Sequence, residues 1–185
     1  MSTLAPTPGQ TVGPFFGYAL PFTGGAELVP AGRPGAIRLH GTVFDGAGLP
    51  VPDAIIELWQ ADENGSVPQV EGSWARDGWT FTGFGRTPVD DTGHYSFTTL
   101  RPGPTEPHRV PFFAVTVFAR GLMHRLFTRA YLPLDPASAA ADPLLSTVAE
   151  DRRATLITRP DAHGFVFDIR LQGPGETVFV EYGAR

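Results

Sequence analysis

Hydrophobic and polar residues alternate along much of the chain with a period of two residues. The pattern is clearest in residues 37–44, IRLHGTVF, where apolar residues and glycine take every second position. Successive side chains of a β-strand point to opposite faces, so this period predicts a strand with one buried face. Residues 54–60, AIIELWQ, form a nearly continuous apolar run, which predicts a largely buried strand.

Turn signals separate the predicted strands from one another. Acidic, glycine-containing clusters at residues 45–48, 62–65 and 90–93 mark three of these turns. Residues 136–150 have helical spacing of their apolar residues, and Pro143 limits them to a short helical segment. Eight or nine short strands at this spacing predict an all-β fold, a β-sandwich. The further strands are predicted at residues 79–84, 94–100, 112–119, 125–132, 154–158, 165–171 and 177–182.

The first 35 residues differ from the rest of the chain in composition. They are rich in Pro, Gly and Thr with scattered aromatic residues, which predicts an extended arm of the kind that lies on a neighbouring chain. Residues 36–185 are predicted to form one sandwich domain. A chain of 185 residues with 42% hydrophobic content is long enough for one hydrophobic core.

Composition excludes several classes of chemistry. The chain has no cysteine, so it has no disulfide, thiolate zinc site, iron-sulfur cluster or cysteine nucleophile. It also has no lysine, which excludes Schiff-base catalysis and a Walker-type phosphate site. A net charge of −5 without a basic run argues against nucleic-acid binding. No apolar run approaches the roughly 18 residues that span a membrane and no signal peptide is evident, so a cytoplasmic protein is expected.

The residues that most often carry chemistry form no recognisable motif. The five histidines contain no HxH or HExxH pair, the serines lie in no GxSxG turn, and the glycines form no phosphate-binding loop. Carboxylates such as Asp62 and Asp90 lie in predicted turns, where they are expected to cap backbone amides. The residue types and their spacing therefore predict a β-sandwich but no specific function. The histidines are His40, His94, His108, His124 and His163.

Residues 41–65, GTVFDGAGLPVPDAIIELWQADENG, closely resemble the strand-turn-strand signature of the intradiol ring-cleavage dioxygenases. ELWQAD followed by NG is the most specific part of the match. The end of the chain, near residues 167–179, resembles the α subunit of a two-chain member of this family, which holds no iron. Shorter matches occur in the family's order: TPGQTVGPF at 7–15, FGRT at 84–87, LRPG at 100–103, FARG at 118–121 and TRAY at 128–131.

The resemblance implies that this chain lacks the family's iron ligands. Iron-binding members use two tyrosines and two histidines, and their positions correspond to Val67, Thr105, Phe112 and Ala114 here. None of these side chains offers a phenolate or an imidazole. The resemblance therefore implies no metal site and no catalytic residue in this chain, with Fe(III) bound by a partner β subunit.

The resemblance also implies a reaction and a role for part of this chain. The reaction would be O2-dependent intradiol cleavage of protocatechuate in a pocket at the α/β interface, within a higher-order αβ oligomer. An arm and one arginine would line the outer side of that pocket, with Arg120 pairing with the substrate carboxylate. Alternatively, Arg120 forms a structural ion pair with an acid on a neighbouring strand, and the arm only clamps the subunits together. The expected substrate-binding residues are Thr11, Gly13, Pro14, Phe15 and Arg120.

Two other interpretations remain open on the sequence. Residues 41–54, GTVFDGAGLPVPDA, also resemble the turn of transthyretin-like sandwiches, which would make the chain a binding or structural module. An independent iron enzyme would need a displaced ligand set such as His108, His124 and Tyr95. The scatter of these three residues along the chain argues against it.

Overall fold

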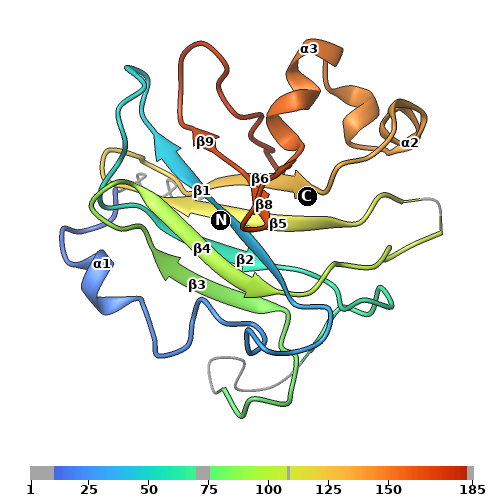
Figure 1. Ribbon diagram of the computed structural model, residues 1–185. Coiled ribbons are helices and arrows are strands. Elements are labelled where there is room, and N and C mark those ends of the chain that lie inside the picture. The colour runs from blue at the N-terminus through green and yellow to red at the C-terminus, as the bar shows by residue number, and fades with distance from the viewer. Residues whose placement is uncertain (1–10, 70–75, 108, 183–185) are drawn as a thin grey trace, which may run out of the picture.

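Two β-sheets pack face to face in the computed structural model, which describes residues 11–69, 76–107 and 109–182 (Figure 1). The predicted β-sandwich is confirmed. One sheet has the order β4 (His94–Thr99), β1 (Ile37–Phe44), β8 (Phe165–Val166) and β7 (Arg159–Pro160), with β9 (Ile169–Arg170) also paired to β1. The other has the order β3 (Phe84–Pro88), β2 (Ile55–Trp59), β5 (Phe112–Phe118) and β6 (Leu126–Tyr131).

The core lies between the two sheets and is built from the inward positions of the strands. Leu39 and Phe97 contribute from the first sheet, and Ile56, Leu58 and Val117 from the second, all fully buried. Burying a side chain of this size stabilises the fold by about 1.5–3 kcal/mol. The two-residue alternation that predicted β1 and β4 therefore corresponds to the buried face of each strand.

A helical segment packs against the end of β6 at Tyr131. It comprises α2 (Pro136–Ala141), α3 (Glu150–Arg153) and two single 3-10 turns, η1 (Leu145–Thr147) and η2 (Ala154–Leu156). Asp135 caps α2 because its carboxylate accepts from the Ser138 amide at 2.9 Å. A second cluster of buried hydrophobic side chains lies beneath this segment and includes Tyr131, Leu145 and Leu156.

The predicted strand over residues 165–171 is split in two. β8 and β9 both pair in parallel with β1, and the chain between them crosses close to Gly41. A Cβ at residue 41 would collide with the Phe167 carbonyl, so only glycine allows this approach. The buried Tyr95 hydroxyl donates to that same carbonyl and fixes the crossing.

Three other strand predictions are wrong in place or type. Residues 79–84 lie mostly before β3, because Asp77 accepts from the Trp79 and Thr80 amides and holds the chain in a turn. Residues 154–158 begin as the 3-10 turn η2. Residues 177–182 are not a strand, although the Val180 amide donates to Phe127 on β6 at 2.7 Å.

Part of the predicted arm packs against the sandwich. The arm carries a single helical turn, α1 (Phe16–Ala19), which lies in Figure 1 on the opposite side of the molecule from α2. The Leu28 amide donates to the Thr98 carbonyl of β4 at 2.8 Å, and the Leu28 side chain is buried. Residues 1–10 of the arm lie outside the described residues. In the part of the chain that the structure describes, no helix is long and apolar enough to cross a membrane.

Candidate functional site

The four positions that the resemblance assigns to the family's iron ligands line a single cavity. Val67, Thr105, Phe112 and Ala114 surround a space of about 170 Å³ at one end of the second sheet. A larger open groove of about 860 Å³ beside α2 contains none of the predicted site residues. The remaining lining residues of the smaller cavity are Trp59, Gln60, Ala61, Gly103 and Pro111.

Strand register brings the floor of this cavity together. Trp59 on β2 and Ala114 on β5 are directly opposite each other, so their side chains share one face of the sheet. Phe112 lies two residues before Ala114 and therefore points to the same face. The ring of Trp59 also packs on Phe84 of β3, with centroids 4.4 Å apart.

Two loops close the cavity, and Asp62 holds them in place. Its carboxylate accepts from the amides of Asn64 at 2.9 Å and Ser66 at 2.8 Å, which is the capping role expected for this residue. Its carbonyl accepts from the Gly103 amide at 2.7 Å and so joins the first loop to the second. Gly65 has φ +87°, and a Cβ there would strike the Pro104 carbonyl. The Asp62 carboxylate thus fixes the first loop, and backbone contacts join it to the second.

Gln60 anchors the cavity from below. The side chain is buried, and its Nε2 donates to the carbonyls of Ala61 at 3.1 Å and Leu100 at 3.0 Å. Its Oε1 accepts from the Thr99 hydroxyl at 2.5 Å. These contacts connect the end of β2 to the end of β4. The donors and the acceptor of the Gln60 amide are therefore already hydrogen-bonded within the chain.

The family's ferric iron does not fit this cavity. The described lining contains alkyl groups, aromatic rings, one amide and one hydroxyl, but no carboxylate, imidazole or phenol. Fe(III) needs anionic or nitrogen ligands of that kind. The Arg129 guanidinium also lies 3.8 Å from the centroid of the Phe112 ring, which places a fixed positive charge close to the cavity wall. A metal cation at this position would be repelled rather than held.

The two described members of the displaced ligand set, Tyr95 and His124, lie in surroundings that do not favour a metal site. Tyr95 is buried, and burial raises the pKa of its phenol well above the ordinary value. His124 is exposed, and His108 lies outside the described residues. Across residues 11–69, 76–107 and 109–182, no group of three or more His, Asp or Glu side chains could hold a metal ion.

The predicted arm residues and Arg120 lie at the other end of β5. The Thr11 hydroxyl accepts from the Gly121 amide at 3.0 Å, so the arm contacts the chain next to Arg120. The Arg120 Nε pairs with the Asp53 carboxylate, which lies in the turn before β2. Arg120 therefore has an acidic partner, as the alternative required, although from a turn. Its side chain is 62% exposed, and within the described chain its terminal nitrogens have no acceptor.

The other predicted arm residues face solvent. Gly13, Pro14 and Phe15 form an exposed turn that leads into α1, and Phe15 is 74% exposed. Six residues separate Ala114 from Arg120, which is about 20 Å along an extended strand. The two predicted sets therefore do not converge on one site within this chain. Their proposed contact with substrate stays a prediction.

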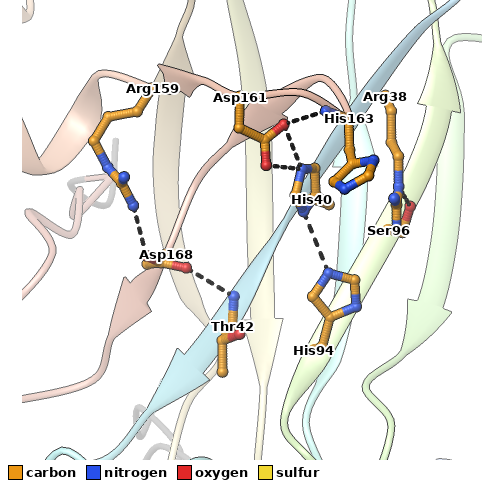
Figure 2. Close-up of polar contacts among 9 residues, drawn as sticks. All are labelled: Arg38, His40, Thr42, His94, Ser96, Arg159, Asp161, His163 and Asp168. Carbon is orange, nitrogen blue, oxygen red and sulfur yellow. Dashed lines mark hydrogen bonds and ion pairs between the residues drawn. The ribbon is translucent and has the colours of Figure 1, made fainter.

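One group of interacting residues was missed by the sequence analysis. His40 on β1 and His94 on β4 lie 3.3 Å apart between Nδ1 and Nε2, and Asp161 contacts the other nitrogen of His40 (Figure 2). The histidines are 54 residues apart in sequence, so no spacing motif links them. A detectable signal was that each occupies an outward-facing position on a predicted strand.

Comparison with known proteins gives consistent results. A sequence model of the family described as Dioxygenase matches residues 13–173. The protocatechuate 3,4-dioxygenase alpha chain of Burkholderia cepacia is 39% identical over 198 residues, covering 98% of this chain and 100% of that protein. The beta chain from the same organism is 33% identical over 159 residues, covering 76% of this chain and 66% of that protein.

A solved structure supports the same fold. The dioxygenase domain of a dioxygenase carbohydrate-binding fusion from Streptomyces sp. SirexAA-E aligns with a TM-score of 0.60 at 28% identity. The alignment covers 91% of this chain and 99% of that domain. A match across residues 13–173 includes both the sandwich and most of the described arm, which favours this family over a transthyretin-like module.

Proposed function

This chain belongs to the intradiol dioxygenase family, and we propose that it is the iron-free α subunit of a protocatechuate 3,4-dioxygenase. The observation that carries the proposal is the cavity lined by Val67, Thr105, Phe112 and Ala114. The cavity supports the proposal because four positions that the resemblance assigns to the ligands lie together, and their side chains offer no phenolate or imidazole. Full-length similarity to an alpha chain supports the same assignment.

The proposed partner is the iron-binding β subunit of the same enzyme. The Fe(III) of that subunit would supply the activation of the aromatic diol, and the net reaction would convert protocatechuate and O2 to 3-carboxy-cis,cis-muconate. An alpha chain and a beta chain of one enzyme both resemble this sequence, which supports an assembly of two related chains. We also propose a cytoplasmic, closed oligomer of αβ units, since soluble oligomers usually have point-group symmetry.

The role proposed for this chain is to complete the wall of the partner's substrate pocket. Phe15 exposes most of its ring in the free chain, and covering it with a partner would remove that apolar area from water. Gly13 permits close approach of backbone to an aromatic ring, and Pro14 limits the flexibility of the turn. Thr11 links this turn to the segment that carries Arg120.

Arg120 is the proposed group for the substrate carboxylate. Its Nε is used by Asp53, which leaves the two terminal nitrogens to make a bidentate pair with a carboxylate. Asp53 would then hold the guanidinium in a fixed orientation. This arrangement assigns both the ion pair and the substrate contact to one side chain.

The decisive experiment measures iron content, visible absorption and O2 uptake with protocatechuate. The chain is prepared alone and co-expressed with its candidate β partner. We expect the chain alone to be colourless and inactive, and the pair to show a tyrosinate-to-iron absorption band and to consume O2. A coloured, active lone chain would show that the assignment of the ligand positions is wrong.

A further inference from the structure

The side chains of Asp161, His40 and His94 form a chain of polar contacts at the outer face of the first sheet, called the relay below. The His40 Nε2 lies 3.2 Å from Asp161 Oδ2, and its Nδ1 lies 3.3 Å from the Nε2 of His94 (Figure 2). The His40 side chain is only 11% exposed. Water therefore has little access to the His40 ring, and its two nitrogens depend on Asp161 and His94 for hydrogen bonds.

The contacts define which nitrogen carries each proton in the neutral pair. The His40 Nε2 faces a carboxylate, so it carries the hydrogen and donates it to Asp161. The His40 Nδ1 is then an acceptor, and the Nε2 of His94 donates to it. Both hydrogens of the neutral pair are therefore used in the relay.

The relay accepts one extra proton but not two. With one extra proton, His40 carries hydrogen on both nitrogens, and His94 changes tautomer so that its Nε2 accepts. With two, both rings are cations, and their facing nitrogens, which both carry hydrogen, are 3.3 Å apart. Two donors and two like charges at this distance repel each other strongly. The second proton is compatible only with separation of the rings.

Asp161 connects the relay to the β7–β8 hairpin. Its Oδ1 accepts from the His163 amide at 2.7 Å, and its backbone amide donates to the Gly164 carbonyl at 3.0 Å. β8 in turn pairs with Leu39 and His40 of β1. Movement of His40 away from His94 would therefore pull on the hairpin that covers this edge of β1.

The surrounding charges favour the same behaviour. Burial, and after it the neighbouring His40 and Arg38, lower the pKa of His94. The His163 amide, and after it His40, hold the pKa of Asp161 below its usual value, so this carboxylate stays ionised through the histidine range. The charged or titratable groups around the pair are Arg38 on β1, Asp90 before β4, Arg159 on β7, Asp161 and His163 in the hairpin, and Asp168 before β9.

We propose that the Asp161–His40–His94 relay is an acid-sensitive latch, which holds the β7–β8 hairpin on β1 and releases it when the pair takes up a second proton. Release would expose the edge of β1 at Leu39 and His40. The proposal depends only on residues of this chain and stands apart from the assignment as an α subunit.

Hydrogen exchange over residues 159–167 tests the latch in the full-length chain. In the open form, the imidazole that cannot be protonated in the closed pair has the ordinary histidine pKa of about 6.5. Lowering the pH from 7.0 to 5.5 should therefore raise the equilibrium constant for opening about eightfold, after correction for intrinsic exchange. The variant His94→Gln keeps a donor but cannot titrate, and it should lose this rise. His124→Gln, at an exposed histidine outside the relay, should retain it.

A rise of at least about threefold that is absent in His94→Gln supports the latch. A smaller rise in the unmodified protein, or an equal rise in His94→Gln, overturns it. If His94→Gln fails to fold, ¹⁵N chemical shifts of the two imidazoles decide the question. The latch allows the closed pair at most one extra proton, and uptake of two protons without faster exchange would contradict it.

Discussion

Replacing Arg86 by methionine should destabilise the chain more than any exposed ion-pair substitution. Arg86 and Glu57 are opposite each other on β3 and β2, with Nε and Nη2 at 2.8 and 2.5 Å from Oε1. Their side chains are only 11% and 14% exposed. The Arg86 Nη1 also donates to the Leu20 carbonyl at 2.9 Å and fastens the segment after α1 to the sheet.

The expected magnitude follows from what each substitution leaves behind. Arg86→Met leaves the buried Glu57 carboxylate without its cationic partner, which should lower the free energy of unfolding by about 3–5 kcal/mol. The double variant Glu57→Leu/Arg86→Met leaves no buried charge unpaired. It loses the hydrogen bond to Leu20 and the contact with the Phe84 ring, so its cost should be about 1–2 kcal/mol. Arg159→Met is the matched control, because its pair with Asp168 is exposed and should contribute less than about 1 kcal/mol.

Urea unfolding followed by tryptophan fluorescence measures these free energies. With an m-value of about 2 kcal/mol/M, Arg86→Met should lower the midpoint by about 2 M without changing m. The reasoning fails if the double variant is at least as destabilised as the sum of the two single variants. It also fails if Arg86→Met and Arg159→Met have the same midpoint.

Three further predictions concern the interface and one buried phenol. Arg120→Ala in the αβ complex should weaken protocatechuate binding more than catechol binding in steady-state kinetics, and equal loss for both would remove Arg120 from the carboxylate site. Phe15→Ala should weaken subunit association by about 10- to 100-fold in sedimentation experiments, whereas Leu49→Ala, at another exposed residue, should not. Burial raises the pKa of Tyr131 to about 12. Because the unfolded phenol ionises near 10, stability should fall as pH rises from 10 to 12, and Tyr131→Phe should lessen this fall.

The sequence predicted the strands whose apolar pattern reflects burial, by alternation in β1 and by a nearly continuous apolar run in β2. β1, β2, β4, β5 and β6 all lie within predicted segments, because one face of each must enter the core. Residues 177–182 have a similar apolar pattern and run along the edge of β6, but they make few backbone hydrogen bonds to it. Their apolar side chains pack against the sheet although the segment is not a strand of it. Residues 79–84 were misplaced because the Asp77 turn competes with the strand.

The sequence could not predict contacts that depend on how distant strands pair. Resemblance to relatives identified residues 67, 105, 112 and 114, but their convergence depends on register and on the Asp62 link between loops. His40 and His94 meet only because β1 and β4 are antiparallel neighbours. The same holds for Arg129, which reaches Phe112 from the adjoining strand.

The backbone around the small cavity is fixed by Asp62, Gly65 and Gln60, none of which depends on the four side chains at the ligand positions. Scaffold and chemistry are therefore separable in this chain, and the cavity is a template for engineering a metal centre. Tyrosine at 67 and 105 and histidine at 112 and 114 would supply the ligands. The Phe112 replacement would also remove the ring on which Arg129 now stacks, so a designer would need to neutralise that arginine in the same step.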